Sequence, residues 1–539
     1  MGNTRQNDRH HVFRFGETLI WPLQLVASTA PGESTHSSLE RWTKIATSGN
    51  TWIETRDNLR KPSTSSHLAY SEYHYFLPHV QRFLYPGKSA GSFRILKRID
   101  SEYLKSASVV LKGGHGPIEF SCICRELLLY IFDTGVLILK LTLEGTHTSL
   151  DELQLFRETF RRAWAPFLPG DDDGTHFPLS VTWNFSGAKS RTFTDLDGDC
   201  WPSLNRVRAP HMPSHWKDLL APLKYDPAAD FGAGISSSLG YAHLGYEQIP
   251  TLSFISVASP SRISRGEQIR VAFSQKLDSP GAGLPYASGF LQSFESRNCY
   301  DRFYDPAVSE HSWMRTRFFV CPYAFTIFCD NSNFSKKDIF GHYLHHYSQL
   351  ALLVHLQKAT LIHFRNRLYH SNLEMAADGA PSGAERVLED LLTFTNTRRF
   401  LEVSTQEQGQ DLYRLLLEHL EIEPLYTQLL QHSRAVAEAI QARRSRTLEI
   451  STLRLTVVAT FGLALALTIG FWGMSLIGDG FPWISALTLP DSVLSPAARI
   501  WVVLLVTVVL SIFVVCAVAL LWRFLARCLG IQRIPQDPG

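Results

Sequence analysis

Leu455–Ile477 reads LTVVATFGLALALTIGFWGMSLI, and Ile500–Trp522 reads IWVVLLVTVVLSIFVVCAVALLW. Neither stretch contains a charged residue. A helix rises about 1.5 Å per residue, so a stretch of this length extends about 34 Å, more than the roughly 30 Å hydrocarbon core of a bilayer. The two stretches therefore predict a hairpin of two transmembrane helices near the C-terminus.

Basic residues flank this hairpin on one side only. Four arginines within 443–454 precede it, and Arg523, Arg527 and Arg533 follow it. The loop 478–499 contains a single basic residue, Arg499. The positive-inside rule then predicts an integral membrane protein of the bacterial inner (plasma) membrane with both termini in the cytoplasm. The opening MGNTRQNDRHH has no apolar region of the signal-peptide kind.

Upstream of the hairpin, the chain has the composition of a mixed α/β protein. Runs of branched and aromatic residues at 108–112, 118–124, 136–143 and 252–257 predict strands, and no proline occurs between Pro424 and Pro482. One helix is therefore expected from about Leu425 to Ile477. The predicted domains are a cytosolic α/β domain (1–383), a helical region and stalk (384–454), transmembrane helices 455–477 and 500–522, the outer loop 478–499 and a cytosolic tail (523–539).

The end of the first apolar stretch carries a short motif. It reads Phe471-Trp472-Gly473-Met474-Ser475, and it follows an α/β region and a long helix. This order resembles the CorA family of divalent-cation channels, whose hallmark at this place is Gly-Met-Asn. Four upstream segments are similar to a divergent bacterial branch of CorA-like proteins: Tyr75–Tyr85 (YFLPHVQRFLY), Tyr130–Leu139 (YIFDTGVLIL), Arg161–Phe167 (RRAWAPF) and Phe400–Tyr413 (FLEVSTQEQGQDLY).

The resemblance implies a homopentamer that passes Mg²⁺ or another divalent cation through a pore lined by the first membrane helix, under control of the cytosolic domain. Gly473 and Met474 match the family motif, and Ser475 replaces its asparagine, so a hydroxyl stands where the family has an amide. No permanently bound cofactor is implied. The expected partners are the lipid bilayer, further copies of the chain and a cytosolic regulatory ligand.

Small and hydroxyl side chains, including Thr460, Ala464 and Thr468, fall on one arc of the first apolar helix. They could line a narrow pore, or they could let helices pack closely in lipid. Asp479 and Asp491 in the loop could attract cations at the outer mouth, or they could be ordinary solvated acids.

Two other patterns imitate metal sites. Asp195, Asp197 and Asp199 lack an acid at the position an EF-hand requires, and His342 and His346 lack a further ligand of the HExxH kind. No nucleotide-binding or hydrolase motif occurs, so no enzyme activity is expected, and no basic face favours nucleic-acid binding. Two alternatives to the channel stay open. One is a membrane effector of CRISPR type III-like antiviral defence, opened by a nucleotide second messenger. The other is a non-conducting membrane-anchored receptor.

Overall fold

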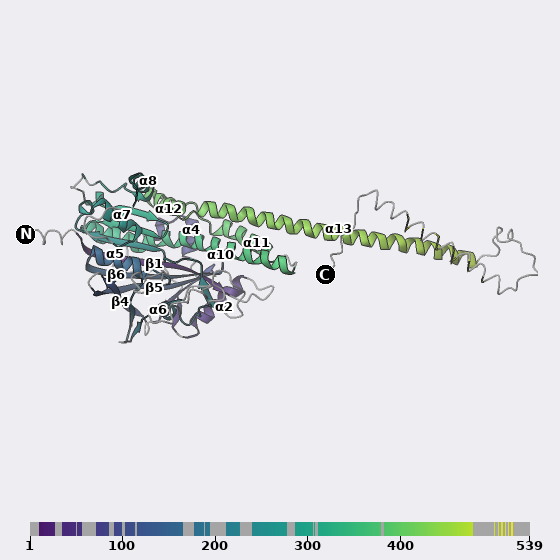
Figure 1. Ribbon diagram of the computed structural model, residues 1–539, viewed down its shortest axis with the longest axis horizontal. Helices are drawn as coiled ribbons and strands as arrows, with labels where there is room; N and C mark the ends of the chain where they lie inside the picture. The colour runs from purple at the N-terminus through teal and green to yellow at the C-terminus, as the bar shows by residue number, and fades with distance from the viewer. Residues whose placement is uncertain are drawn as a thin grey trace, which may run out of the picture. The chain divides into compact units, whose positions relative to one another are not determined.

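The computed structural model is organised around β1 (His11–Val26), a central strand of a 13-stranded mixed sheet (Figure 1). β1 pairs antiparallel with β10 on one side and with β6 on the other, and its last residues pair with β9. The strand order is β11-β12-β13-β10-β1-β6-β5-β4-β7-β8, with β3 on β5 and β2 on β3. β10 and β13 run parallel.

The other strands are β2 (Trp52–Thr55), β3 (Phe93–Arg98), β4 (Leu104–Gly113), β5 (Gly116–Phe132), β6 (Val136–Ser149), β7 (Ser180–Phe185), β8 (Ser190–Phe193), β9 (Gly240–His243), β10 (Thr251–Val257), β11 (Cys299–Tyr300), β12 (Arg317–Cys321) and β13 (Ala324–Cys329). The helices are α2 (Thr35–Thr47), α4 (Pro78–Leu84), α5 (Leu150–Phe160), α6 (Ser214–Leu220), η3 (Pro260–Arg262), α7 (Arg265–Phe273), α8 (Ser288–Asn298), η4 (Ser312–Met314), η5 (Ser335–Ile339), α9 (Phe340–His342), η6 (Tyr343–Tyr347), α10 (Ser348–Asp378), α11 (Ser382–Thr397), α12 (Glu407–His419) and α13 (Ile422–Ile477).

The structure describes residues 10–26, 35–49, 51–55, 72–85, 91–99, 103–113, 116–164, 177–187, 189–194, 212–226, 240–276, 286–305, 307, 311–378, 382–477, 501, 505, 508–509, 512–513, 516 and 519–520. The chain divides into two units, residues 1–437 and 438–539. Each unit is described by itself below.

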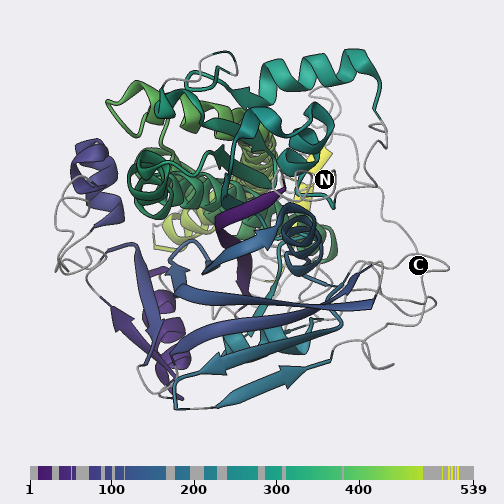
Figure 2. The same ribbon diagram turned by 90° about the vertical axis from the view of Figure 1, so that its left-hand side faces the viewer.

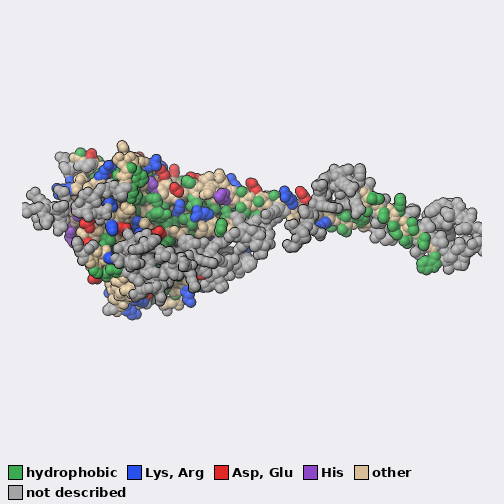
Figure 3. Space-filling view, viewed as in Figure 1, with side chains coloured by type: hydrophobic (Ala, Val, Ile, Leu, Met, Phe, Trp, Pro, Cys, Tyr) green, Lys and Arg blue, Asp and Glu red, His purple; other side chains and the backbone are tan. Residues whose placement is uncertain are grey.

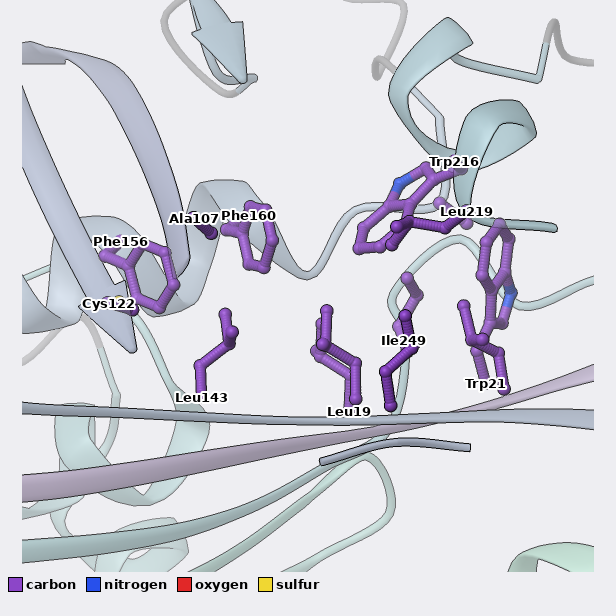
Figure 4. Close-up of a cluster of buried hydrophobic side chains, with 14 of the residues drawn as sticks. Leu19, Trp21, Ala107, Cys122, Leu143, Phe156, Phe160, Trp216, Leu219 and Ile249 are labelled. Atoms are coloured by element: carbon purple, nitrogen blue, oxygen red, sulfur yellow. The ribbon is translucent and has the colours of Figure 1, made fainter. Parts of the chain in front are cut away.

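One face of the sheet carries the hydrophobic core. Successive side chains of a strand point to opposite faces, so Leu19 and Trp21 of β1 share a face with Leu143 of β6. These side chains point toward Phe156 and Phe160 of α5 and Trp216 of α6 (Figure 4). α5 begins where it does because Ser149 and Glu152 form a capping box at its first turn.

The opposite face is covered by η6 and α10, and its centre, where β1 meets β6, carries polar side chains. Thr18 and Gly16 of β1 lie opposite Thr142 and Glu144 of β6 on this face. Tyr343 of η6 packs directly above them, since a Cβ on Gly16 would lie 2.6 Å from its ring. Figure 2 shows this division, with the blue strands of residues near 100–150 and the dark green helices of residues near 340–400 in separate layers.

A buried ion pair interrupts the hydrophobic core under α5. Arg157 Nε lies 3.3 Å from a carboxylate oxygen of Glu17, and both side chains are at most 2 % exposed. Arg157 also donates to Ser253 Oγ and Thr326 Oγ1, each at 2.8 Å. Burial raises the pKa of Glu17 and lowers that of Arg157, while the attraction between the two opposes both changes. The pair therefore ties β1, β10 and β13 to α5 at one point.

The predicted fold class, with its two-helix transmembrane hairpin, is wrong. The structure has an α/β fold with a 13-stranded mixed sheet, and in the part of the chain that it describes no helix is long and apolar enough to cross a membrane. Several residues of 455–477 and most of 500–522 lie outside the described residues, as does the whole of 478–499.

The functions that depended on this hairpin are corrected for the same reason. A channel for Mg²⁺ or another divalent ion needs a path across the membrane that is lined by membrane-spanning helices. The predicted membrane effector and the predicted membrane-anchored receptor need such helices as well. Without a described helix able to span the bilayer, the predictions of a membrane protein, of metal-ion transport and of a bacterial inner-membrane location are overturned.

Candidate functional site

The predicted pore residues form no site in the described part of the chain. Thr460 is exposed on α13, and its hydroxyl donates to the carbonyl of Thr456, one turn back in the same helix. Thr456 bonds Thr452 in the same way at 2.8 Å. Five further predicted residues belong to α13, but their side chains lie outside the described residues: Ala464, Thr468, Gly473, Met474 and Ser475. Asp479 and Asp491 lie outside the described residues altogether.

The histidine pattern that imitates a metal site gains no further ligand among the residues that the structure describes. His342 and His346 have stacked rings with centroids 4.8 Å apart. Over the described ranges, no three His, Cys, Asp or Glu side chains are grouped so that they could hold a metal ion. Asp195, Asp197 and Asp199 lie outside these ranges.

The same histidines nevertheless belong to an unusual piece of backbone. The helix that covers the polar face of the sheet contains two π-helical turns, η5 and η6, on either side of α9. π-helical turns are rare, and they occur frequently at functional sites because they shift side chains out of the regular helical register. η6 carries Tyr343, His345, His346 and Tyr347, all of which contact other elements.

Glu72 is the charged centre of this region. Its carboxylate accepts hydrogen bonds from Tyr85 Oη at 2.6 Å and Gln349 Nε2 at 3.3 Å, and it lies 2.6 Å from His345 Nδ1. Burial alone would raise the pKa of Glu72, but the hydrogen bond and charge of His345, with smaller contributions from Tyr85 and Lys140, outweigh it and lower the pKa. The carboxylate is therefore held ionised in a nearly buried place.

Aromatic rings continue the site toward α12. The rings of Tyr75 and His346 are stacked, with centroids 4.1 Å apart and planes 8° from parallel, and His346 in turn stacks on His342. Gln408 of α12 donates to Tyr347 Oη at 2.9 Å. We call Glu72, Tyr75, Tyr85, His342, His345, His346 and Gln349 the η6 cluster.

Segments far apart in the sequence meet at the η6 cluster. Leu77 N donates to the carbonyl of Val403 at 2.8 Å, and Ser404 Oγ donates to the carbonyl of Tyr75 at 2.5 Å. Gly409 packs so closely that a Cβ there would lie 2.0 Å from Tyr75 Oη. The segment that follows Glu72 is thus docked along the start of α12.

Charged side chains of the sheet lie beneath the cluster. Lys140 of β6 is 3 % exposed and lies 2.9 Å from Glu126 of β5. Nearby, Glu144 binds both Arg14 and Arg125, and Arg14 lies over the ring of Phe340. The polar layer between sheet and helix is therefore neutralised largely by local ion pairs.

Two adjacent arginines connect the sheet to the beginning of α13. Arg398 pairs with Asp133 at the turn between β5 and β6, with 2.5 Å between the charged atoms. Arg399 pairs with Glu423 of α13 and lies over the ring of Tyr426, 4.2 Å from its centroid. Together they clamp the first turns of α13 to the rest of residues 1–437.

The corner between α12 and α13 is also held from α10. Glu421 adopts a left-handed conformation with φ 51°, which ends α12 and allows α13 to start in a new direction. Lys358 Nζ donates to the carbonyl of Leu420 at 2.7 Å, satisfying a group that the end of α12 leaves free. Because α12 touches the η6 cluster at one end and α13 at the other, a change at the cluster has a short route to α13.

The sequence drew attention to His342 and His346 but not to Glu72, which belongs to no motif. The available signal was the stretch SEYHYFLPHVQRFLY, which contains Glu72 and is rich in aromatic residues and histidine. Its partner in space is more than 250 residues away, so spacing could not connect the two.

No family model matches the chain, and no curated protein matches it.

Proposed function

We propose that this chain is a non-catalytic regulatory protein, related to the CorA-like family, in which a small ligand acts at the η6 cluster and α13 carries the response. Ion conduction is not part of the proposal, and no permanently bound cofactor is included. The ligand is one that brings a cationic or hydrogen-bond-donating group, since the carboxylate of Glu72 only accepts hydrogen bonds.

One observation carries the proposal. Three of the four segments in which the sequence resembles CorA-like proteins contribute to the η6 cluster or to its connection with α13. Tyr75–Tyr85 supplies two members of the cluster, Phe400–Tyr413 docks against them, and Tyr130–Leu139 contains the Asp133 that binds Arg398. The resemblance therefore concentrates at one place, as expected for a shared regulatory site.

The response is expected to pass through α12. We expect Glu72→Gln to weaken the hold of the cluster on α12 and to speed amide hydrogen exchange in α12 and in α13 up to Ala437. Glu295→Gln is the matched control, because Glu295 also has a basic partner, Arg265, but on an exposed surface of α8. Equal exchange in the wild type and Glu72→Gln would refute the proposed route.

Acidification should act on the same group. The folded-state pKa of Glu72 lies below its ordinary value of 4.5, so its contribution to stability is present at higher pH and is lost as pH falls through the folded-state pKa. We expect Glu72→Gln to lower the free energy of unfolding by about 2 kcal/mol at neutral pH, the scale of hydrogen bonds to a charged acceptor. The difference in free energy of unfolding between the wild type and Glu72→Gln should vanish at low pH. Chemical denaturation of both proteins at a series of pH values measures it. A cost that does not change with pH would contradict this role of the charge.

Self-association through α13 is the second part of the proposal. Near the start of α13, Leu429 is buried within the chain and is not available to a second copy. Further along α13, Leu448, Leu455, Val458 and Leu463 are 65 to 72 % exposed, and at 100° per residue they share an arc of about 140°. Figure 3 shows apolar side chains at the surface of this helix. An apolar face of this kind favours a second copy of the same helix as its cover.

We expect Leu455→Glu to weaken self-association of the full chain at least tenfold, a change of about 1.4 kcal/mol, because the new charge would have to be buried between helices. Sedimentation velocity over a concentration series measures it. Thr460→Glu places the same charge on the same helix outside the arc and should have a smaller effect. A wild-type protein that remains monomeric would remove this part of the proposal.

A further inference from the structure

Two histidines from different strands face each other at the ends of β1 and β6, and neither belongs to the η6 cluster. His11 begins β1 and His147 lies near the end of β6. Val12 pairs with Thr148 and Arg14 pairs with Thr146, which places Phe13 opposite His147. His11 is therefore the diagonal neighbour of His147 across the two strands. His11 Nε2 lies 3.2 Å from His147 Nδ1, and the site is open to solvent.

The distance between these two nitrogens suits a shared metal ion. With metal–nitrogen bonds of about 2.0–2.1 Å, two imidazoles on a tetrahedral ion have nitrogens roughly 3.3–3.4 Å apart. A right-angled arrangement on an octahedral or square-planar ion brings them to about 2.9 Å. The observed separation lies between these limits, so either geometry needs only a small turn of the rings.

The surroundings hold the two rings in this relation. Phe13 packs edge-on against His11, with centroids 4.7 Å apart, and also contacts His147. His147 has φ 55°, a conformation uncommon for residues other than glycine, asparagine and aspartate. In the absence of metal, one imidazole donates its N–H to the other. Metal binding requires that this proton move to the other nitrogen of the same ring, which leaves both facing nitrogens with free electron pairs.

We propose that His11 and His147 form a binding site for a divalent transition-metal ion such as Zn²⁺ or Cu²⁺, with water completing the coordination. Imidazole nitrogen suits these ions, whereas Mg²⁺ prefers oxygen ligands. The bound ion would fasten the first residues of β1 to the last residues of β6. The proposal does not depend on the function of the η6 cluster.

The test is Zn²⁺ binding to the untagged full chain, measured by titration calorimetry. His11→Gln and His147→Asn each remove one ligand, and asparagine tolerates the left-handed conformation of residue 147. Each variant should bind Zn²⁺ at least about tenfold more weakly at this site, with the loss of one of two protein ligands. His432→Gln, which changes an exposed histidine of α13, is the control and should bind as the wild type does.

Cu²⁺ provides a direct view of the ligands. Electron paramagnetic resonance of the wild type should show coupling to two nitrogens, and of either variant to one. Mg²⁺ should produce no heat at this site. Unchanged Zn²⁺ affinity in both variants, or a loss equal to that of His432→Gln, would overturn the proposal, as would a wild type that does not bind Zn²⁺.

Discussion

Arg157→Met is expected to lower the free energy of unfolding by about 3–5 kcal/mol, the cost of leaving one member of a buried ion pair without its partner. Methionine fills much of the volume but donates no hydrogen bond. The carboxylate of Glu17 would then remain in the core, and Ser253 and Thr326 would each lose the hydrogen bond that Arg157 donates to them. Chemical denaturation of the wild type and the variant measures the difference.

A second variant distinguishes loss of the ion pair from a general packing defect. Replacing both charges, Glu17→Leu with Arg157→Met, removes the stranded carboxylate and should recover part of the loss. Arg265→Met breaks the exposed pair with Glu295 and should leave the stability nearly unchanged. If the double variant loses as much as the two single changes added together, the two charges do not interact in the way proposed here.

Gly409→Ala is expected to destabilise the protein by about 1–3 kcal/mol, the usual cost of extra volume in a packed interior. The new methyl group would lie 2.0 Å from Tyr75 Oη and 2.6 Å from Cζ of the same ring. That ring is buried and stacked on His346, so it has little room to withdraw. Thermal unfolding followed by circular dichroism measures the loss.

Gly289→Ala provides the matched control for this change. Gly289 is also helical, in α8, but a Cβ there meets nothing within 4 Å. Alanine favours the helix over glycine, so this variant should gain up to about 1 kcal/mol. Equal effects at the two glycines would mean that α12 can move away from Tyr75 without cost.

The local sequence pattern predicted strands well where a strand buries one or both of its faces. The runs at 108–112, 118–124, 136–143 and 252–257 lie in β4, β5, β6 and β10. Alternation and branched side chains suffice there because neighbouring strands supply a regular environment. The order of strands in the sheet could not be read in this way, since β1 pairs with residues more than 220 positions later in the chain.

The candidate site was largely hidden from sequence for a related reason. Glu72, Glu17 and Arg157 resemble ordinary surface charges until the elements that bury them are placed. The membrane prediction failed differently. It used only the length and apolar character of two stretches, and no helix among the described residues combines the two to the extent that spanning a bilayer requires.

The central position of β1 has a consequence for how the protein is made. β6 can pair with β1 early, and β5 with β6, but the other edge of β1 must wait for β10, which begins at Thr251. At about 5–20 residues per second, a ribosome takes roughly 10–45 s to add the chain between Val26 and Thr251. Throughout that interval a nascent chain presents an unpaired strand edge of at least seven residues, the kind of surface that aggregates or recruits chaperones. Production of this protein should therefore depend on chaperone supply more strongly than its size alone suggests.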